Sequence, residues 1–200
     1  MREFVRQGDE ILKNEHPANS FVLRGFAGMP KWPTFNAIWG LDSVAIAMYP
    51  MYRGVAKVVG MTVLPPAESM SEEIDMLEKH WNDHNFFFVH IKKTDSYGED
   101  GNFDGKVGII EEVDALIPRI MALDPDVLII TGDHSTPARL KAHSWHAIPT
   151  MLWSKNARPD GIHEFGERAC LRGSLGTRFD ANELMPLALS HALRLEKFGA

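Results

Sequence analysis

Two short segments in the second half of the chain carry residue types that bind metal ions. Thr131–Pro137 contains an Asp-His pair, and His143–Pro149 adds further histidines soon afterwards. A carboxylate beside an imidazole offers hard oxygen together with borderline nitrogen, which suits zinc or manganese. This combination, placed after an apolar run, predicts metal-assisted phosphoryl chemistry.

Each of these residues also has an ordinary interpretation. Asp133 and His134 could form a hydrogen-bonded turn before a helix capped by Thr136 and started by Pro137. His143, taken alone, could be a surface or core histidine. Their position in the fold therefore has to decide between the two interpretations.

The run 126–131 favours the metal site. It is continuous, β-branched and bounded by Pro125 and Gly132, which predicts a strand buried on both faces of a parallel sheet. Asp133 and His134 then lie at its carboxyl end, where ligands collect in open α/β sheets.

A second group of ligand-type residues follows another strand-like run. Phe86–Lys93 has strong β propensity, and the turn predicted over Thr94–Gly101 contains three carboxylates. Three acids in one turn repel one another unless a cation lies among them. The alternative is a solvated acidic loop before a helix that begins near Asn102. Because two strands each end in ligand-type residues, we expect one shared metal site.

The rest of the pattern predicts alternating strands and helices. A helical stripe over 107–121 would return the chain in a right-handed crossover between the two groups. The other expected elements are a helix over 4–14, strands at 19–24, 42–48 and 148–153, helices at 52–59 and 69–81 (with Ser71 as a cap), and a capping box at 180–183 before the last helix.

The ordered series of motifs resembles the metal-binding half of cofactor-independent phosphoglycerate mutases, in the archaeal-type branch of the alkaline phosphatase superfamily. The resemblance covers nearly the whole chain. It is carried by Val22–Gly25, Met29-Pro30, Gly54–Met61, the pattern Thr94-Asp95-x-x-Gly98-x-Asp100-Gly101, the segments 131–137 and 143–149, Gly173–Gly176 and Leu184–Pro186.

The resemblance implies a three-layer, mostly parallel α/β fold with two divalent metal ions and no 2,3-bisphosphoglycerate. It assigns Asp95 and His143 to one ion, and Asp133 with His134 to the other. Glu99 stands where the family usually has histidine, and its oxygen favours manganese or magnesium over zinc, with cobalt as a further alternative. Manganese is therefore the expected metal.

The same resemblance assigns the substrate contacts. It implies that Arg24 and Arg53 grip the phosphate and carboxylate of a small phosphorylated substrate, for which the bidentate guanidinium is suited. For Arg53 an ordinary surface role is an equal alternative.

Two parts of the family pattern are absent from the sequence. The family has an amino-terminal strand that ends in Asp-Gly and a serine that becomes phosphorylated, whereas Ser43, Ser96 and Ser135 do not lie in that context. We therefore expect a carboxyl-terminal half, incomplete on its amino-terminal side, with a lead-in helix over 1–20 and a metal-binding domain over 21–200. The other half, or a complementary chain, would be its partner, and self-association through an open sheet edge is an alternative.

Composition restricts the remaining classes. The net charge of −6 argues against a nucleic-acid or membrane partner, because both surfaces are anionic. The single cysteine, Cys170, is consistent with a reducing cytoplasm. Two other functions stay open: another phosphomutase or hydrolase of the same superfamily, such as a phosphopentomutase or phosphonate-cleaving enzyme, and a non-catalytic partner half.

Overall fold

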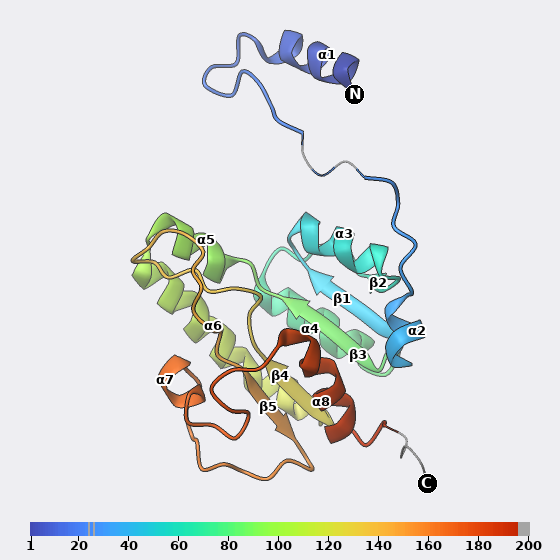
Figure 1. Cartoon of the computed structure of the whole chain (residues 1–200), viewed down its shortest axis with the longest axis vertical. Coiled ribbons are helices and arrows are strands. Elements are labelled where there is room, and N and C mark those ends of the chain that lie inside the picture. Colours follow the sequence, from blue (N-terminus) through green and yellow to red (C-terminus); the bar gives the residue numbers. More distant parts are fainter. Residues whose placement is uncertain (24, 26, 196–200) are drawn as a thin grey trace. The chain divides into compact units, whose positions relative to one another are not determined.

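The computed structural model describes residues 1–23, 25 and 27–195, and the chain forms two compact units, Met1–Trp32 and Pro33–Ala200 (Figure 1). The first unit contains α1 (Arg2–Leu12). The elements of the second unit are α2 (Phe35–Trp39), β1 (Ser43–Ala47), α3 (Pro50–Val58), β2 (Thr62–Val63), α4 (Met70–His80), β3 (Phe86–His90), α5 (Lys93–Asp100), α6 (Phe103–Ala122), β4 (Val127–Ile130), β5 (Met151–Ser154), α7 (Glu167–Cys170), a 3-10 turn (Ala181–Glu183) and α8 (Leu184–His191).

The first unit is an amphipathic helix with the following segment folded against it. Phe21 meets the ring of Phe4 edge-on at 5.9 Å between ring centroids, and Ser20 donates a 2.8 Å hydrogen bond to Asp9. The strand expected at 19–24 is wrong for residues 19–23, because Ser20 and Phe21 contact α1 and the segment joins no sheet among the described residues. Arg24, the last residue of that expected strand, lies outside the described residues.

The second unit is organised around a parallel sheet of strand order β2-β1-β3. All five residues of β1 are buried, as expected for a central strand with helices on both faces. Val44 and Ile46 form a core with Ile74 and Leu77 of α4, and α6 adds Leu116 to the same side. On the opposite side the small residues of β1 let α3 approach closely. This three-layer arrangement confirms the predicted α/β class with a parallel sheet flanked by helices.

Strand β4 differs from its prediction. It pairs antiparallel with β5, with Leu128 opposite Trp153, and all four of its residues remain partly exposed. The prediction of a strand buried on both faces of a parallel sheet is therefore wrong for β4 and fits β1 instead. The physical reason is local, because the loop after β4 returns the chain directly alongside it as β5.

Several local predictions are refined by the hydrogen bonds. Ser69 caps α4 by accepting from the Glu72 amide, whereas the predicted cap, Ser71, contacts Arg119. The acidic segment 94–101 is a helix, α5, which ends at the left-handed Gly101. The capping box before α8 is confirmed. Among the described residues, no helix is both long and apolar enough to cross a membrane.

One charged residue lies in the core beneath β1. The side chain of Glu73 is 0 % exposed, and neither carboxyl oxygen has a hydrogen-bond partner of normal geometry among the described residues. Burial raises the pKa of Glu73 to about 7, and the Met48 backbone opposes that rise only in part. The folded chain therefore holds this proton up to a pH at which the unfolded chain has already released it.

We predict that this proton makes the free energy of unfolding pH-dependent. Between the ordinary pKa of 4.5 and the folded value of about 7, the folded state binds more protons than the unfolded state, so stability falls as pH rises. Glu73→Gln should remove this slope and exceed the parent at pH 8, by up to roughly 3 kcal/mol. Urea unfolding at pH 5 and pH 8 measures it.

Glu112→Gln, on the exposed side of α6, is the matched control and should leave the slope unchanged. An equal slope in the parent and in Glu73→Gln would show that Glu73 is already ionised in the folded chain.

Candidate metal centre

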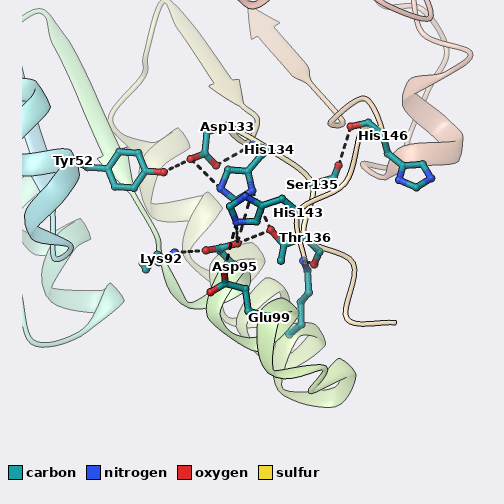
Figure 2. A network of polar contacts seen from close by, with 11 residues as sticks. Tyr52, Lys92, Asp95, Glu99, Asp133, His134, Ser135, Thr136, His143 and His146 are labelled. Carbon is teal, nitrogen blue, oxygen red and sulfur yellow. Dashed lines mark hydrogen bonds and ion pairs between the residues drawn. The ribbon is translucent and has the colours of Figure 1, made fainter. Parts of the chain in front are cut away.

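Two segments that follow different strands meet at the centre. Helix α5 follows β3 and presents Asp95 and Glu99, which share a helix face because they are four residues apart. The segment after β4 carries Asp133 and His134, and the loop beyond it brings His143. Figure 2 shows the two histidine rings lying between the carboxylates of Asp133 and Asp95.

Asp95, His134 and His143 can each offer one ligand atom, and these atoms all lie within 4.8 Å of one another. His143 Nε2 is 3.7 Å from Asp95 Oδ1, and His134 Nδ1 is 3.8 Å from the same oxygen. The two imidazole rings stack at 3.8 Å between centroids. A mixed set of imidazole nitrogen and carboxylate oxygen fits a divalent ion such as manganese or zinc.

Asp95 is the most enclosed of these groups, with its side chain 14 % exposed. Burial works to raise its pKa, but hydrogen bonds from Lys92 and Thr136 and the charge of Lys92 outweigh burial and hold the pKa of Asp95 below its ordinary value. Asp95 is therefore ionised at neutral pH, which is the state a metal ligand requires.

Asp133 is held by an aromatic neighbour from α3. The Tyr52 hydroxyl donates a hydrogen bond to Asp133 Oδ2, and the Tyr52 ring stacks on His90 at 3.8 Å. Burial tends to raise the pKa of Asp133, but the Tyr52 hydrogen bond contributes to a net lowering. Burial and the same hydrogen bond raise the pKa of Tyr52 to about 12, so its hydroxyl remains a donor.

Thr136 links the two segments. Its side chain is 3 % exposed, its hydroxyl donates to Asp95, and His134 Nδ1 lies 3.0 Å from that hydroxyl. Lys106 of α6 donates a 2.7 Å hydrogen bond to the Thr136 carbonyl. Gly98 of α5 packs directly on the same carbonyl, where a Cβ atom would clash. Thr136 thus orients a carboxylate and an imidazole at once, and it caps no helix, since only a turn follows at Pro137.

The other predicted residues lie at different distances from this centre. Glu99 Oε1 lies 3.5 Å from His143 Nε2. Asp133 Oδ2 lies 3.5 Å from His134 Nε2. Arg53 instead donates to the carbonyls of Ala47 and Leu64, at 3.1 Å and 2.6 Å, which ties its guanidinium to the ends of β1 and β2. Arg24 lies outside the described residues.

Sequence reasoning missed the residues that hold the ligands in place. Tyr52 and Lys106 come from other helices, and no short motif connects them with Asp95 or Asp133. Lys92 did carry a signal, because it lies three residues before Asp95, one helical turn away. Gly98 did carry a signal, because a glycine inside a helix costs stability unless the backbone must approach a neighbour.

The comparison with protein families agrees with this geometry. Residues 9–191 match the family described as Metalloenzyme superfamily. The chain belongs to the Metalloenzyme superfamily. The description of this superfamily implies metal binding, which agrees with the three grouped metal-ligating side chains.

Several relatives of this superfamily member are known by sequence. The chain is 54 % identical over 198 residues to the probable 2,3-bisphosphoglycerate-independent phosphoglycerate mutase of Thermotoga neapolitana, and 51 % identical over 200 residues to that of Thermotoga maritima. The matched regions include 99 % and 100 % of this chain but only 49 % and 50 % of the two relatives. The chain therefore spans about half the length of these relatives, and the resemblance to a mutase half is confirmed.

Solved structures support the fold. The PH0037 protein from Pyrococcus horikoshii superposes with a TM-score of 0.86 at 29 % identity, over all of this chain and 58 % of that one. The cofactor-independent phosphoglycerate mutase from Thermoplasma acidophilum matches with a TM-score of 0.67 at 21 % identity, over 96 % of this chain and 51 % of that one.

We predict that Gly98→Ala destabilises the chain. An alanine inside a helix normally stabilises it relative to glycine, but here the added methyl group must push α5 away from the Thr136 carbonyl. We expect a loss of about 1 to 3 kcal/mol in the free energy of unfolding, the usual cost of overpacking. Urea denaturation measures it.

Gly108→Ala is the matched control, because Gly108 lies inside α6 with nothing near its Cβ position. It should be neutral or stabilising by about 0.5–1 kcal/mol. Similar behaviour of the two variants would contradict a tight contact at Gly98.

Proposed function

We propose that this chain is one half of a 2,3-bisphosphoglycerate-independent phosphoglycerate mutase, which interconverts 3-phosphoglycerate and 2-phosphoglycerate. The observation that carries the proposal is that ligand atoms of Asp95, His134 and His143 lie within 4.8 Å of one another. The chain is also 54 % identical over 198 residues to a protein named as a probable mutase of this kind. In this proposal Asp95, Glu99, Asp133, His134 and His143 hold two divalent ions, with manganese favoured.

The residues around the ligands have defined tasks in this scheme. Lys92 and Thr136 keep Asp95 ionised and fix the direction of its carboxylate. Thr136 also contacts His134 Nδ1, so the other ring nitrogen of His134, Nε2, points towards Asp133. Tyr52 holds Asp133 from the opposite side. Divalent ions at this centre would neutralise phosphate oxygens and lower the pKa of an attacking hydroxyl.

The remaining parts of the reaction belong to other residues. Arg53 and Arg24 are proposed to contact the substrate anion. The serine that accepts the phosphate is assigned to the half that this chain does not cover. The cytoplasmic location expected from the single cysteine stays a prediction.

The alternative, a non-catalytic partner half, also has a specific observation in its favour. Lys92 and Tyr52 already satisfy one oxygen each of Asp95 and Asp133, so both carboxylates are paired without a metal ion. A measurement of metal binding separates the two proposals. A metal ion must compete with Lys92 and Tyr52 for the carboxylates, and a non-catalytic half does not require that exchange.

We predict that the purified chain binds Mn²⁺ and that Asp95→Asn weakens this binding by about tenfold or more, since an amide oxygen carries no charge. Calorimetric titration with manganese, together with elemental analysis, measures it. Asp114→Asn, exposed on α6, is the control and should bind like the parent. No manganese in the parent after incubation would favour the non-catalytic half.

We also predict that the chain alone does not turn over 3-phosphoglycerate. The centre can hold metal and part of the substrate, but the phosphate acceptor is missing from the sequence. A coupled assay for 2-phosphoglycerate, with manganese present, measures this. Turnover at an ordinary enzymatic rate, roughly 1 per second or more, would place the acceptor within this chain and contradict the assignment of a half.

A further inference from the structure

The ammonium group of Lys92 lies at the metal centre, on one of the candidate ligands. It donates a hydrogen bond to Asp95 Oδ2, whereas Thr136 donates to Asp95 Oδ1. The nearest nitrogens of His134 and His143 lie 3.8 Å and 3.7 Å from Oδ1 as well. Lys92 therefore takes the carboxylate oxygen that these other groups leave open.

A second contact holds the same ammonium group. Lys92 Nζ lies 5.1 Å from the centre of the Tyr49 ring, within the range of a cation–π interaction. Tyr49 lies beside Tyr52, with 6.0 Å between the ring centroids. In Figure 2, Lys92 and Tyr52 approach the carboxylates of Asp95 and Asp133 from the same side. The Tyr49 ring thus offers the ammonium group a favourable position beside Asp95, within reach of its flexible stem.

The helix that begins at this point does not explain why a lysine is placed there. Lys92 is the N-cap residue of α5, and its side chain makes no capping hydrogen bond. Capping positions favour Ser, Thr, Asp and Asn, and a cation at this end meets the positive pole of the helix dipole. The position of Lys92 therefore points to a task at the metal centre rather than to the stability of α5.

The charges of the centre favour an exchange of partners. Asp95, Glu99 and Asp133 bring three carboxylates together, and the hydrogen bond to Asp95 raises the pKa of Lys92, so the ammonium group stays charged at neutral pH. The Lys92 side chain is 26 % exposed, which leaves it a way out of the centre. A divalent ion on Asp95 would share one carboxylate with the ammonium group, and the two positive charges would repel each other.

We propose that Lys92 exchanges partners: its ammonium group occupies Asp95 while no metal ion is bound, and it moves to the phosphate group of the substrate once a divalent ion binds Asp95. Lys92 thereby competes with the metal ion and assists the binding of phosphate. An ammonium group is a compact point charge that suits phosphate oxygens. The inference rests on the proposed function, which supplies both the metal ion and the phosphorylated substrate.

Titration with Mn²⁺ in the absence of phosphate tests the competition. Lys92→Met keeps an unbranched apolar side chain but removes the charge, so this variant should bind Mn²⁺ about tenfold or more tightly than the parent. Calorimetry and the electron paramagnetic resonance signal of free Mn²⁺ measure it. Lys93→Met is the matched control, because it removes the same charge from the exposed neighbour, and its Mn²⁺ affinity should stay within about twofold of the parent.

Titration with inorganic phosphate at saturating Mn²⁺ tests the second contact. Lys92→Met should bind phosphate about tenfold or more weakly than the parent, since it loses a charge-assisted hydrogen bond, and Lys93→Met should bind it like the parent. Lys92→Gln, which keeps a hydrogen-bond donor without the charge, should resemble Lys92→Met in both titrations. Circular dichroism establishes that each variant is folded.

Two results would overturn the exchange. The first is Mn²⁺ binding by Lys92→Met that is no tighter than that of the parent, which would make Lys92 a structural partner of Asp95. The second is phosphate binding by Lys92→Met that equals that of the parent. Failure of the proposed function gives a different pattern, in which neither the parent nor Lys92→Met binds Mn²⁺. Binding of Mn²⁺ by Lys92→Met but not by the parent would support the competition.

Discussion

The contact of Gly98 with the carbonyl of Thr136 is the constraint on which the candidate centre depends. It brings the helix after β3 against the segment after β4, although these strands share no sheet among the described residues. At this contact the Thr136 hydroxyl reaches both Asp95 and His134, and Lys106 fixes the same residue from α6. Without that close approach, the two halves of the ligand set would belong to separate parts of the molecule.

The electrostatic arrangement follows from the same enclosure. Burial alone would favour neutral carboxyl groups, but Lys92 and Tyr52 supply donors that keep Asp95 and Asp133 ionised, with pKa values below their ordinary range. Glu73 shows the opposite outcome, since no donor of normal geometry from the described part of the chain reaches it and burial raises its pKa to about 7. The centre therefore differs from an ordinary buried carboxylate through its donors rather than through its burial.

Burial differs between the strands of the second unit. The core around β1 is closed by helices on both faces, whereas all residues of β3 and β4 are partly exposed. The candidate ligands follow the two partly exposed strands, β3 and β4, while the fully buried strand β1 belongs to the core.

The sequence by itself determined the α/β class, most strands and helices, and the residue types at the two strand ends, because periodicity and strand-end position are local properties. It did not determine the pairing of β4 with β5, the helix at 94–101 or the absence of a strand at 19–23. Each of these depends on which surface the segment meets. Tertiary structure alone placed Tyr52 on Asp133 and Thr136 on Asp95, since these contacts join residues 81 and 41 positions apart, a separation that carries no sequence pattern.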